Sequence, residues 1–154
     1  MEIQDILNEA CVVTSLKATS KKQALNELAR VAAEKTGLPE RAIFDVLLER
    51  ERLGTTGVGA GIAIPHGKLP ELEKLFGCFA RLDHPVEFDA VDNAPVDLVF
   101  LLLAPESAGA DHLKALARIS RVLRNSIHCD KLRTAPTSDK IYALLTADPQ
   151  SRAA

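Results

Sequence analysis

The most restrictive feature of this sequence is a run of apolar residues from Val96 to Ala104, interrupted only by Asp97. A strand with apolar residues on both faces has to be covered from both sides, so this run predicts the buried centre of a sheet. Strand-like runs at 11–16 and 75–82, with a shorter candidate at 86–89, are interspersed with helical patterns. This order predicts an α/β fold, a mixed β-sheet flanked by α-helices.

The helical segments carry recognisable start and stop signals. A serine with a glutamine three residues later is typical of a capping box, and a glycine after the last periodic residue is typical of a C-terminal stop. Residues 54–61 include four glycines and are expected to form a loop. The expected helices run from a Ser20 cap with Gln23 to a Gly37 stop, from Pro39 to about Leu53, from Ala110 to about Arg124, and from a Ser138 or Asp139 cap near the end.

Length and composition bound the class of protein. The 154 residues are enough for one domain over 1–154, with a core over about 5–147 and a flexible polar tail at 148–154. A net charge of −2 and an aromatic content of 4% without tryptophan give no basis for nucleic-acid binding. The N-terminus lacks a signal-peptide pattern and no apolar run is long enough for a membrane span. We therefore expect a cytoplasmic protein without membrane insertion.

The three cysteines, Cys11, Cys78 and Cys129, are far apart and form no C-x-x-C pair. Their odd number and wide spacing are typical neither of a disulfide framework nor of a zinc site. We expect reduced thiols that lie largely in the core.

The segment GVGAGIAIPHGK at 57–68 places one histidine, His66, after a short β-branched run and between glycines. Neutral imidazole is a nucleophile near pH 7 and accepts a phosphoryl group, while clustered backbone N–H groups form anion-binding concavities. The pattern matches neither the dinucleotide-binding glycine motif nor the P-loop, so an ATP-using enzyme is not indicated. The segment is either a phosphoryl-accepting site or a surface loop with an incidental histidine.

Other polar residues have two interpretations each. His112 shares a helical arc with Leu116 and Ile119, so it is either a core histidine or a partner that faces His66. The charged run at 49–52 is either a solvated surface or the source of an arginine, Arg50 or Arg52, that binds a phosphoryl oxyanion. His84, before Pro85 in an expected turn, and His128, near a helix end, are interpreted as solvated bystanders.

The segment RERLGTTGVGAGIAIPHGK at 50–68 closely resembles the phosphorylation-site segment of the fructose/mannitol-type IIA domains of the bacterial phosphotransferase system. The similarity extends over nearly the whole chain, through Ile6-Leu7, FDAVDNAPVDL at 88–98 and His112-Leu113. Within that family the chain is most similar to the nitrogen-regulatory branch. One departure is Ala60, where members of the family often carry asparagine.

The resemblance implies that His66 is the phosphoryl acceptor, through Nε2, and that His112 and Arg50 support the phosphoryl group. It implies an HPr-like phosphocarrier as donor, supplied by enzyme I and phosphoenolpyruvate, and no metal or other cofactor. Regulatory targets such as ion-transport regulators or sensor kinases are the implied further partners. The loop glycines are expected to cradle the phosphate; they are Gly57, Gly59, Gly61 and Gly67.

Three functional hypotheses follow. The first is a regulatory phosphocarrier, a phosphotransferase component without ATP-dependent kinase activity, that acts on other proteins according to its phosphorylation state. The second is a sugar-transport component that passes its phosphoryl group to the IIB domain of a permease. The third is a binding module that is not phosphorylated, or a metal site on His66 and His112, for which the sequence offers no clear additional ligands.

Overall fold

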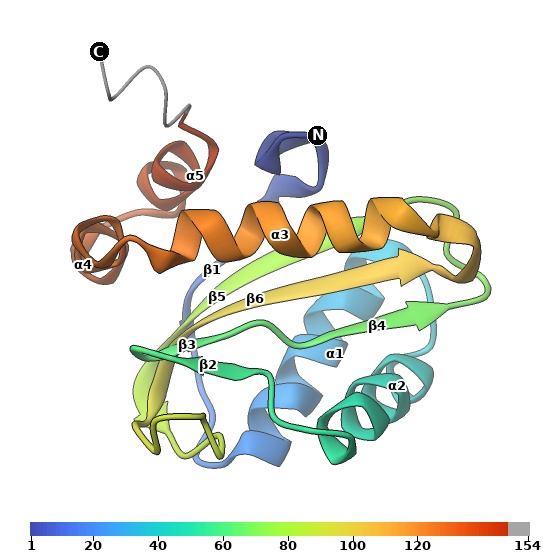
Figure 1. Cartoon of the computed structure of the whole chain (residues 1–154), viewed down its shortest axis with the longest axis horizontal. Helices are drawn as coiled ribbons and strands as arrows, with labels where there is room; N and C mark the ends of the chain where they lie inside the picture. The colour runs from blue at the N-terminus through green and yellow to red at the C-terminus, as the bar shows by residue number, and fades with distance from the viewer. Residues whose placement is uncertain (148–154) are drawn as a thin grey trace.

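The computed structural model describes residues 1–147 and shows a six-stranded mixed sheet with helices on both faces (Figure 1). Helices α1 and α2 cover one face, α3 crosses the other, and α4 and α5 follow at one end of α3. The elements in chain order are η1 (Ile3–Asp5), β1 (Leu7–Leu16), α1 (Lys21–Thr36), α2 (Glu40–Arg52), β2 (Gly57–Gly59), β3 (Ile62–Ala63), β4 (His66–Leu69), β5 (Phe76–Val86), β6 (Val96–Pro105), η2 (Glu106–Ala108), α3 (Ala110–Arg124), α4 (Ser126–Thr134) and α5 (Ser138–Thr146).

Strand β6 is the centre of the sheet, as the apolar run predicts. The strand order is β1-β5-β6-β3-β2. Strand β4 pairs with the same edge of β6 as β3 does, but nearer the C-terminal end of β6. Strands β3 and β4 run parallel to β6, whereas β5 runs antiparallel to it. Every residue of β6 except Asp97 is buried, because helices cover both sides of this strand.

The connection from β3 to β4 brings the predicted active-site segment against β6. In the parallel register His66 lies opposite Leu102, and the Leu102 N–H donates to the Pro65 carbonyl at 3.0 Å. Gly67 lies against Val46 of α2 so closely that an added Cβ would stand 2.3 Å from Val46 Cγ1. Helix α2 therefore packs directly on the backbone of β4, and its last turn reaches the start of that strand.

The helix signals are confirmed at α1. Ser20 accepts a hydrogen bond from the Gln23 N–H, and Gly37 ends the helix in a left-handed conformation with φ of 78°. The Gln23 side chain accepts from the Thr19 N–H, one residue before the expected partner in the capping box. The expected helix over 110–124 coincides with α3.

Three sequence predictions of local structure are wrong. Residues 86–89 form no separate strand, because Val86 ends β5 and Asp89 turns the chain with φ of 55°. The expected turn at His84 is part of β5, where the register against β6 is irregular and tolerates Pro85. Residues 57–59 of the expected loop pair with β3 as a short hairpin.

The C-terminal region differs from the prediction in two further ways. Thr137, and not Ser138 or Asp139, caps α5, because its hydroxyl accepts from the Lys140 N–H at 3.4 Å. Helix α4 was not predicted, and His128 is buried in it, 7% exposed, and not solvated as expected. His84 is exposed, as predicted. The predicted tail at 148–154 lies outside the described residues.

Candidate active site

His66 is held in place by the backbone on both sides of it. It is the first residue of β4 and follows Pro65, whose carbonyl is bonded to the central strand. Proline restricts the preceding residue to extended conformations, so the chain enters the strand in a defined direction. The half-buried ring of His66 consequently projects from a backbone segment that is hydrogen-bonded to the central strand.

Two hydrogen bonds define the protonation of the His66 ring. Nδ1 lies 2.9 Å from the Ile64 carbonyl oxygen, which only accepts, so Nδ1 must carry the proton. The Nε–H of Arg50 donates to Nε2 at 3.2 Å, which requires a lone pair on that nitrogen. The ring is therefore the neutral Nδ1–H tautomer with a nucleophilic Nε2.

The pKa of His66 lies below its ordinary value of 6.5. Burial is the largest cause, and the nearby Arg50 charge lowers the pKa further, while the Ile64 carbonyl and the Glu51 carboxylate oppose the shift. The imidazole is consequently neutral, and Nε2 unprotonated, at neutral pH.

Arg50 reaches His66 from the last turn of α2. Its Nη1 also donates to the Gly54 carbonyl at 2.9 Å, so the guanidinium is held between the turn after the helix and the ring. The close contact between Gly67 and Val46 makes this reach possible, because it brings α2 against β4. Arg50 thus contacts the nitrogen of His66 that the resemblance implies as the phosphoryl acceptor.

His112 lies beside His66, in the first turn of α3. The two ring centroids are 5.5 Å apart and the planes are tilted by 52°. His112 is 8% exposed, and within residues 1–147 its buried Nδ1 atom has no hydrogen-bond partner. Burial, then the neighbouring His66 and Lys68, lower its pKa below 6.5. A buried ring nitrogen without a partner is costly in a folded protein, which favours the functional interpretation of His112 over the purely structural one.

The hairpin glycines have other neighbours. Gly57 and Gly59 lie in β2, beside Ala90 and Asp92, and the Ala60 N–H donates to the Asp92 carboxylate. Since β3 lies opposite Leu98 and Val99 of β6, whereas His66 lies opposite Leu102, the hairpin is displaced along the sheet by about 10 Å.

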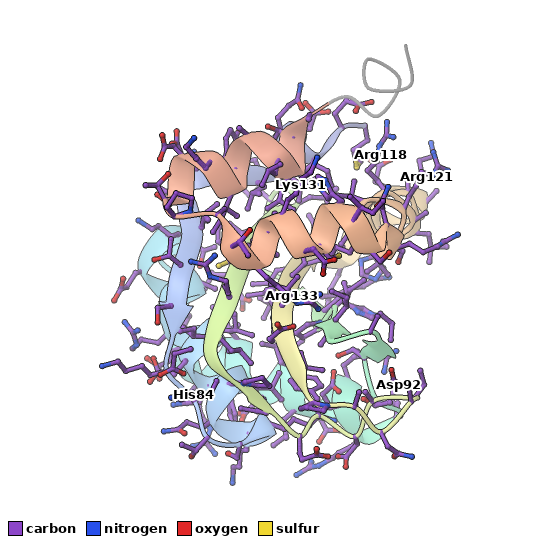
Figure 2. All side chains as sticks on the ribbon, turned by 90° about the vertical axis from the view of Figure 1, so that its left-hand side faces the viewer. His84, Asp92, Arg118, Arg121, Lys131 and Arg133 are labelled. Carbon is purple, nitrogen blue, oxygen red and sulfur yellow. The ribbon has the colours of Figure 1, made fainter. Side chains whose placement is uncertain are left out.

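Gly61 lies at the turn of this hairpin with φ of 82°. The guanidinium of Arg133, a residue of α4 (Figure 2), binds the Asp97 carboxylate through two nitrogens and also donates to the Ala60 carbonyl at 2.8 Å. A Cβ on Gly61 would stand 2.6 Å from the guanidinium. The contacts of Gly57, Gly59 and Gly61 are those of a clamped hairpin and not of a phosphate cradle around His66; of the four predicted glycines, Gly67 alone adjoins it.

Sequence reasoning missed the backbone groups of the site. The Ile64 carbonyl fixes the tautomer of His66, and the Gly54 carbonyl holds Arg50. Every residue has a carbonyl, so no residue type marks these positions in a sequence. Glu51 was not singled out either; it is a buried acidic residue in the last turn of α2, where the helix dipole disfavours a negative charge.

The three cysteines lie in the core, as the sequence analysis expected. Cys11, Cys78 and Cys129 are free and buried, and burial raises the pKa of Cys78 to about 12. Within residues 1–147, no three or more histidine, cysteine or acidic side chains are grouped as metal ligands. None of the helices in that range is both long and apolar enough to cross a membrane.

The similarity of the chain to known proteins gives the class to which it belongs. Residues 5–148 match the family model described as "Phosphoenolpyruvate-dependent sugar phosphotransferase system, EIIA 2". The chain is a member of this EIIA family.

Three relatives narrow the comparison. A nitrogen regulatory protein of Bradyrhizobium diazoefficiens is 60% identical over 153 residues, which cover 99% of this chain and 100% of that protein. The crystal structure of the nitrogen regulatory protein IIA-Ntr from Neisseria meningitidis superposes with a TM-score of 0.89 at 35% identity, covering 94% of this chain and 99% of the other. The fructose-specific EIIA component of Haloferax volcanii is 38% identical over 127 residues, 82% of each chain. The chain is therefore similar to the nitrogen regulatory members of the family over almost its whole length.

Proposed function

We propose that this chain is a phosphohistidine carrier of a nitrogen-related phosphotransferase system. It accepts a phosphoryl group on Nε2 of His66 from the phosphohistidine of an HPr-like carrier, which enzyme I loads from phosphoenolpyruvate. The observation that carries the proposal is the locked Nδ1–H tautomer, which leaves the lone pair of Nε2 beside Arg50 and the ring of His112.

The transfer needs no proton movement at the acceptor. Nε2 of His66 attacks the phosphorus in line, the P–N bond of the donor breaks, and its electron pair returns to the donor imidazole. In the product Nδ1 of His66 keeps its proton and its bond to the Ile64 carbonyl, so the phosphorylated ring is an imidazolium whose positive charge lies beside the negative phosphoryl oxygens. The Ile64 carbonyl therefore holds the proton on Nδ1 both before and after transfer.

Arg50 and His112 supply the electrostatic contribution. In the free protein Arg50 donates to Nε2, and during transfer its guanidinium turns to the equatorial oxygens, where the negative charge lies. His112 offers a ring nitrogen that has no partner within the described residues. A bond to a phosphoryl oxygen would satisfy one of its ring nitrogens in the phosphorylated form.

The surface around the site suits a protein donor. Leu53, directly after α2, is 86% exposed, and Leu113, directly after His112, is 67% exposed. Leu53 follows the last turn of α2, which carries Arg50, and Leu113 lies in the first turn of α3 together with His112. Large exposed apolar side chains around a polar centre are typical of a surface that binds another protein.

The phosphorylation state of His66 would regulate partner proteins, which we expect to include ion-transport regulators or sensor kinases. The alternative is transport, in which the chain passes its phosphoryl group to a IIB domain, and the similarity to the fructose-specific component keeps this alternative open. The higher identity and coverage of the nitrogen regulatory relative favour regulation. A chain that fails to phosphorylate fructose- and mannitol-type IIB domains would support the regulatory role, whereas rapid transfer to one of them would support transport.

The proposal is tested by phosphoryl transfer from phosphoenolpyruvate through enzyme I and the HPr-like carrier of the same system. We expect one acid-labile, base-stable phosphoryl group on the wild-type chain and none on His66→Ala. His84→Ala is the matched control, because His84 is an exposed histidine in β5, outside the site, and should be labelled like the wild type. An unlabelled wild-type chain, or a fully labelled His66→Ala variant, would contradict the proposal.

A further inference from the structure

Glu51 is a buried carboxylate in the last turn of α2, directly after Arg50. Its side chain is 3% exposed, and Lys21 Nζ, at the start of α1, lies 3.0 Å from Oε1. Both helix ends are electrostatically unfavourable for these charges, since the acid stands at a C-terminus and the base at an N-terminus. Because the helix dipoles disfavour both charges, the burial of Glu51 requires specific stabilising contacts.

Those contacts are with the turn that follows α2. The Thr56 N–H donates to Glu51 Oε1 at 3.0 Å, and the Thr56 hydroxyl donates to Oε2. Thr56 is itself 4% exposed. Lys21 is further held over the ring of Phe88 at 4.9 Å, with the Asp89 carboxylate at 3.7 Å. Glu51 thus ties together the start of α1, the end of α2 and the turn at 53–56.

From Thr56 a path of hydrogen bonds leads to the reactive histidine. The Thr56 carbonyl accepts from the Ile64 N–H at 3.0 Å, and the Ile64 carbonyl accepts from Nδ1 of His66 at 2.9 Å. This path holds atoms in place and does not transmit polarisation from one hydrogen bond to the next, because the N–H and C=O of one residue belong to different peptide units. It fixes where the Ile64 carbonyl stands, and this carbonyl determines the tautomer of the ring.

A second path leads from the same turn to the arginine. Arg50 donates to the Gly54 carbonyl at 2.9 Å, and the Gly54 N–H donates to the Glu51 carbonyl at 3.1 Å. The turn at 53–56 therefore holds both the Ile64 carbonyl and the Arg50 guanidinium. Both are directed at the ring of His66, one at Nδ1 and the other at Nε2.

We propose that Glu51 is a positioning residue for phosphoryl transfer: anchored by Lys21, it holds Thr56 and the adjoining turn so that the Ile64 carbonyl and Arg50 meet the two nitrogens of His66. This inference rests on the proposed function for its kinetic consequence. Its structural consequence is the fraction of His66 rings in the Nδ1–H tautomer, and this fraction is independent of that function.

The test measures two properties of the Glu51→Leu variant. Leucine fills a similar volume but removes every hydrogen bond of the Glu51 side chain. The ring-nitrogen chemical shifts of His66 report the tautomer, and transfer from the phosphorylated carrier reports kcat and KM. We expect a mixed tautomer and a kcat lower by on the order of 10- to 100-fold, with KM for the carrier unchanged. Glu51→Gln, which keeps an oxygen for the Thr56 N–H, should restore part of kcat.

Two further variants make the result specific. Thr56→Val removes the hydroxyl bond with little change in volume and should shift both readouts in the same direction, less strongly. Glu49→Gln is the matched control, because Glu49 lies in the same helix turn, is exposed and pairs only with Arg52 among the described residues. It should leave both readouts unchanged.

A pure Nδ1–H tautomer and a wild-type kcat in folded Glu51→Leu, or in Thr56→Val if Glu51→Leu does not fold, would overturn the inference. A wild-type chain that accepts no phosphoryl group would instead overturn the proposed function. In that case the tautomer of the variants would still decide the role of Glu51.

Discussion

The Nε2 atom of His66 has two uses, since it accepts a hydrogen bond from Arg50 in the free protein and is the proposed nucleophile in transfer. The two are compatible because a hydrogen bond from a cation opposes protonation of the ring. Arg50 thus keeps the lone pair of Nε2 unprotonated until the donor arrives, and then becomes available for the phosphoryl oxygens.

At Arg50 this account gives a prediction with two parts. Arg50→Met should raise the pKa of His66 toward 6.5, because one of the causes that depress it is removed while burial remains. It should also slow phosphoryl transfer by about 100- to 1,000-fold, the usual effect of losing a group that stabilises transition-state charge. Proton NMR titration and rapid-quench transfer measure the two parts.

The control for Arg50 is its neighbour Arg52, which is exposed and pairs with Glu49. Arg52→Met should alter neither the pKa of His66 nor the transfer rate substantially. Equal effects of the two substitutions would show that the general positive charge of the helix end matters, and not the contact with Nε2.

His112 gives a prediction about the product rather than the acceptor. His112→Leu should still be phosphorylated on His66, but the phosphorylated form should hydrolyse about tenfold faster, because one donor to the phosphoryl group is lost. His112→Gln, which retains an N–H donor, should recover part of the lifetime. An unchanged lifetime in His112→Leu would return His112 to the interpretation as a core residue.

At the scale of elements, the contact between α2 and β4 determines whether Arg50 reaches His66. Val46 packs directly against the Gly67 backbone, and it is β-branched, so its side chain has little freedom to move aside. The glycine is therefore required by close approach and not by its backbone conformation, since its φ is not in the left-handed region.

This contact predicts that Gly67→Ala destabilises the fold by about 1–3 kcal/mol, as overpacking does, and slows transfer by separating Arg50 from His66. Val46→Ala should relieve both defects when combined with Gly67→Ala. Urea unfolding and transfer rates of the four proteins in the double-mutant cycle measure the coupling. Additive effects would contradict the proposed contact.

The accuracy of the sequence predictions varies with the kind of signal at each element. Helix α1 has a serine cap and a glycine stop, and the apolar run of β6 is interrupted only by Asp97, so both were predicted well. Helix α4 was not predicted because Asn125 both ends α3 and caps α4, so no loop separates the two helices. The strand predicted at 86–89 is absent because Val86 is a buried residue at the end of β5, and not the first residue of another strand.

At the scale of the whole molecule, the burial of two neutral histidines makes folding depend on pH. Both His66 and His112 have a pKa below 6.5 in the folded chain, in each case mainly through burial. Between the folded and unfolded pKa values the unfolded chain binds more protons. The free energy of unfolding therefore rises with pH through this window and levels off above about 6.5.

Urea unfolding between about pH 5 and about pH 7.5 measures this dependence. We expect the wild-type chain to lose stability as the pH falls below about 6.5, and a His66→Gln/His112→Leu double variant to lose less over the same range. An equal loss in both proteins would assign the pH dependence to other groups.

The residues of the candidate site come from three separated parts of the chain, which the sequence indicated without showing how they are arranged. The resemblance over 50–68 and at His112-Leu113 indicated His66, His112 and Arg50. Their meeting depends on the parallel pairing of β4 with β6 and on helices from both faces of the sheet, which are tertiary properties. The same pairing displaces the hairpin glycines along the sheet, which local sequence does not reveal.

The measurement that tests the central claim most directly is a long-range nitrogen–proton NMR spectrum of the chain after phosphorylation by the HPr-like carrier. We predict a single phosphorylated ring, that of His66, with the phosphoryl group on Nε2 and the proton retained on Nδ1. A phosphoryl group on Nδ1 of His66, or on any other histidine, would contradict the account, because the Ile64 carbonyl would then not direct the reaction to Nε2.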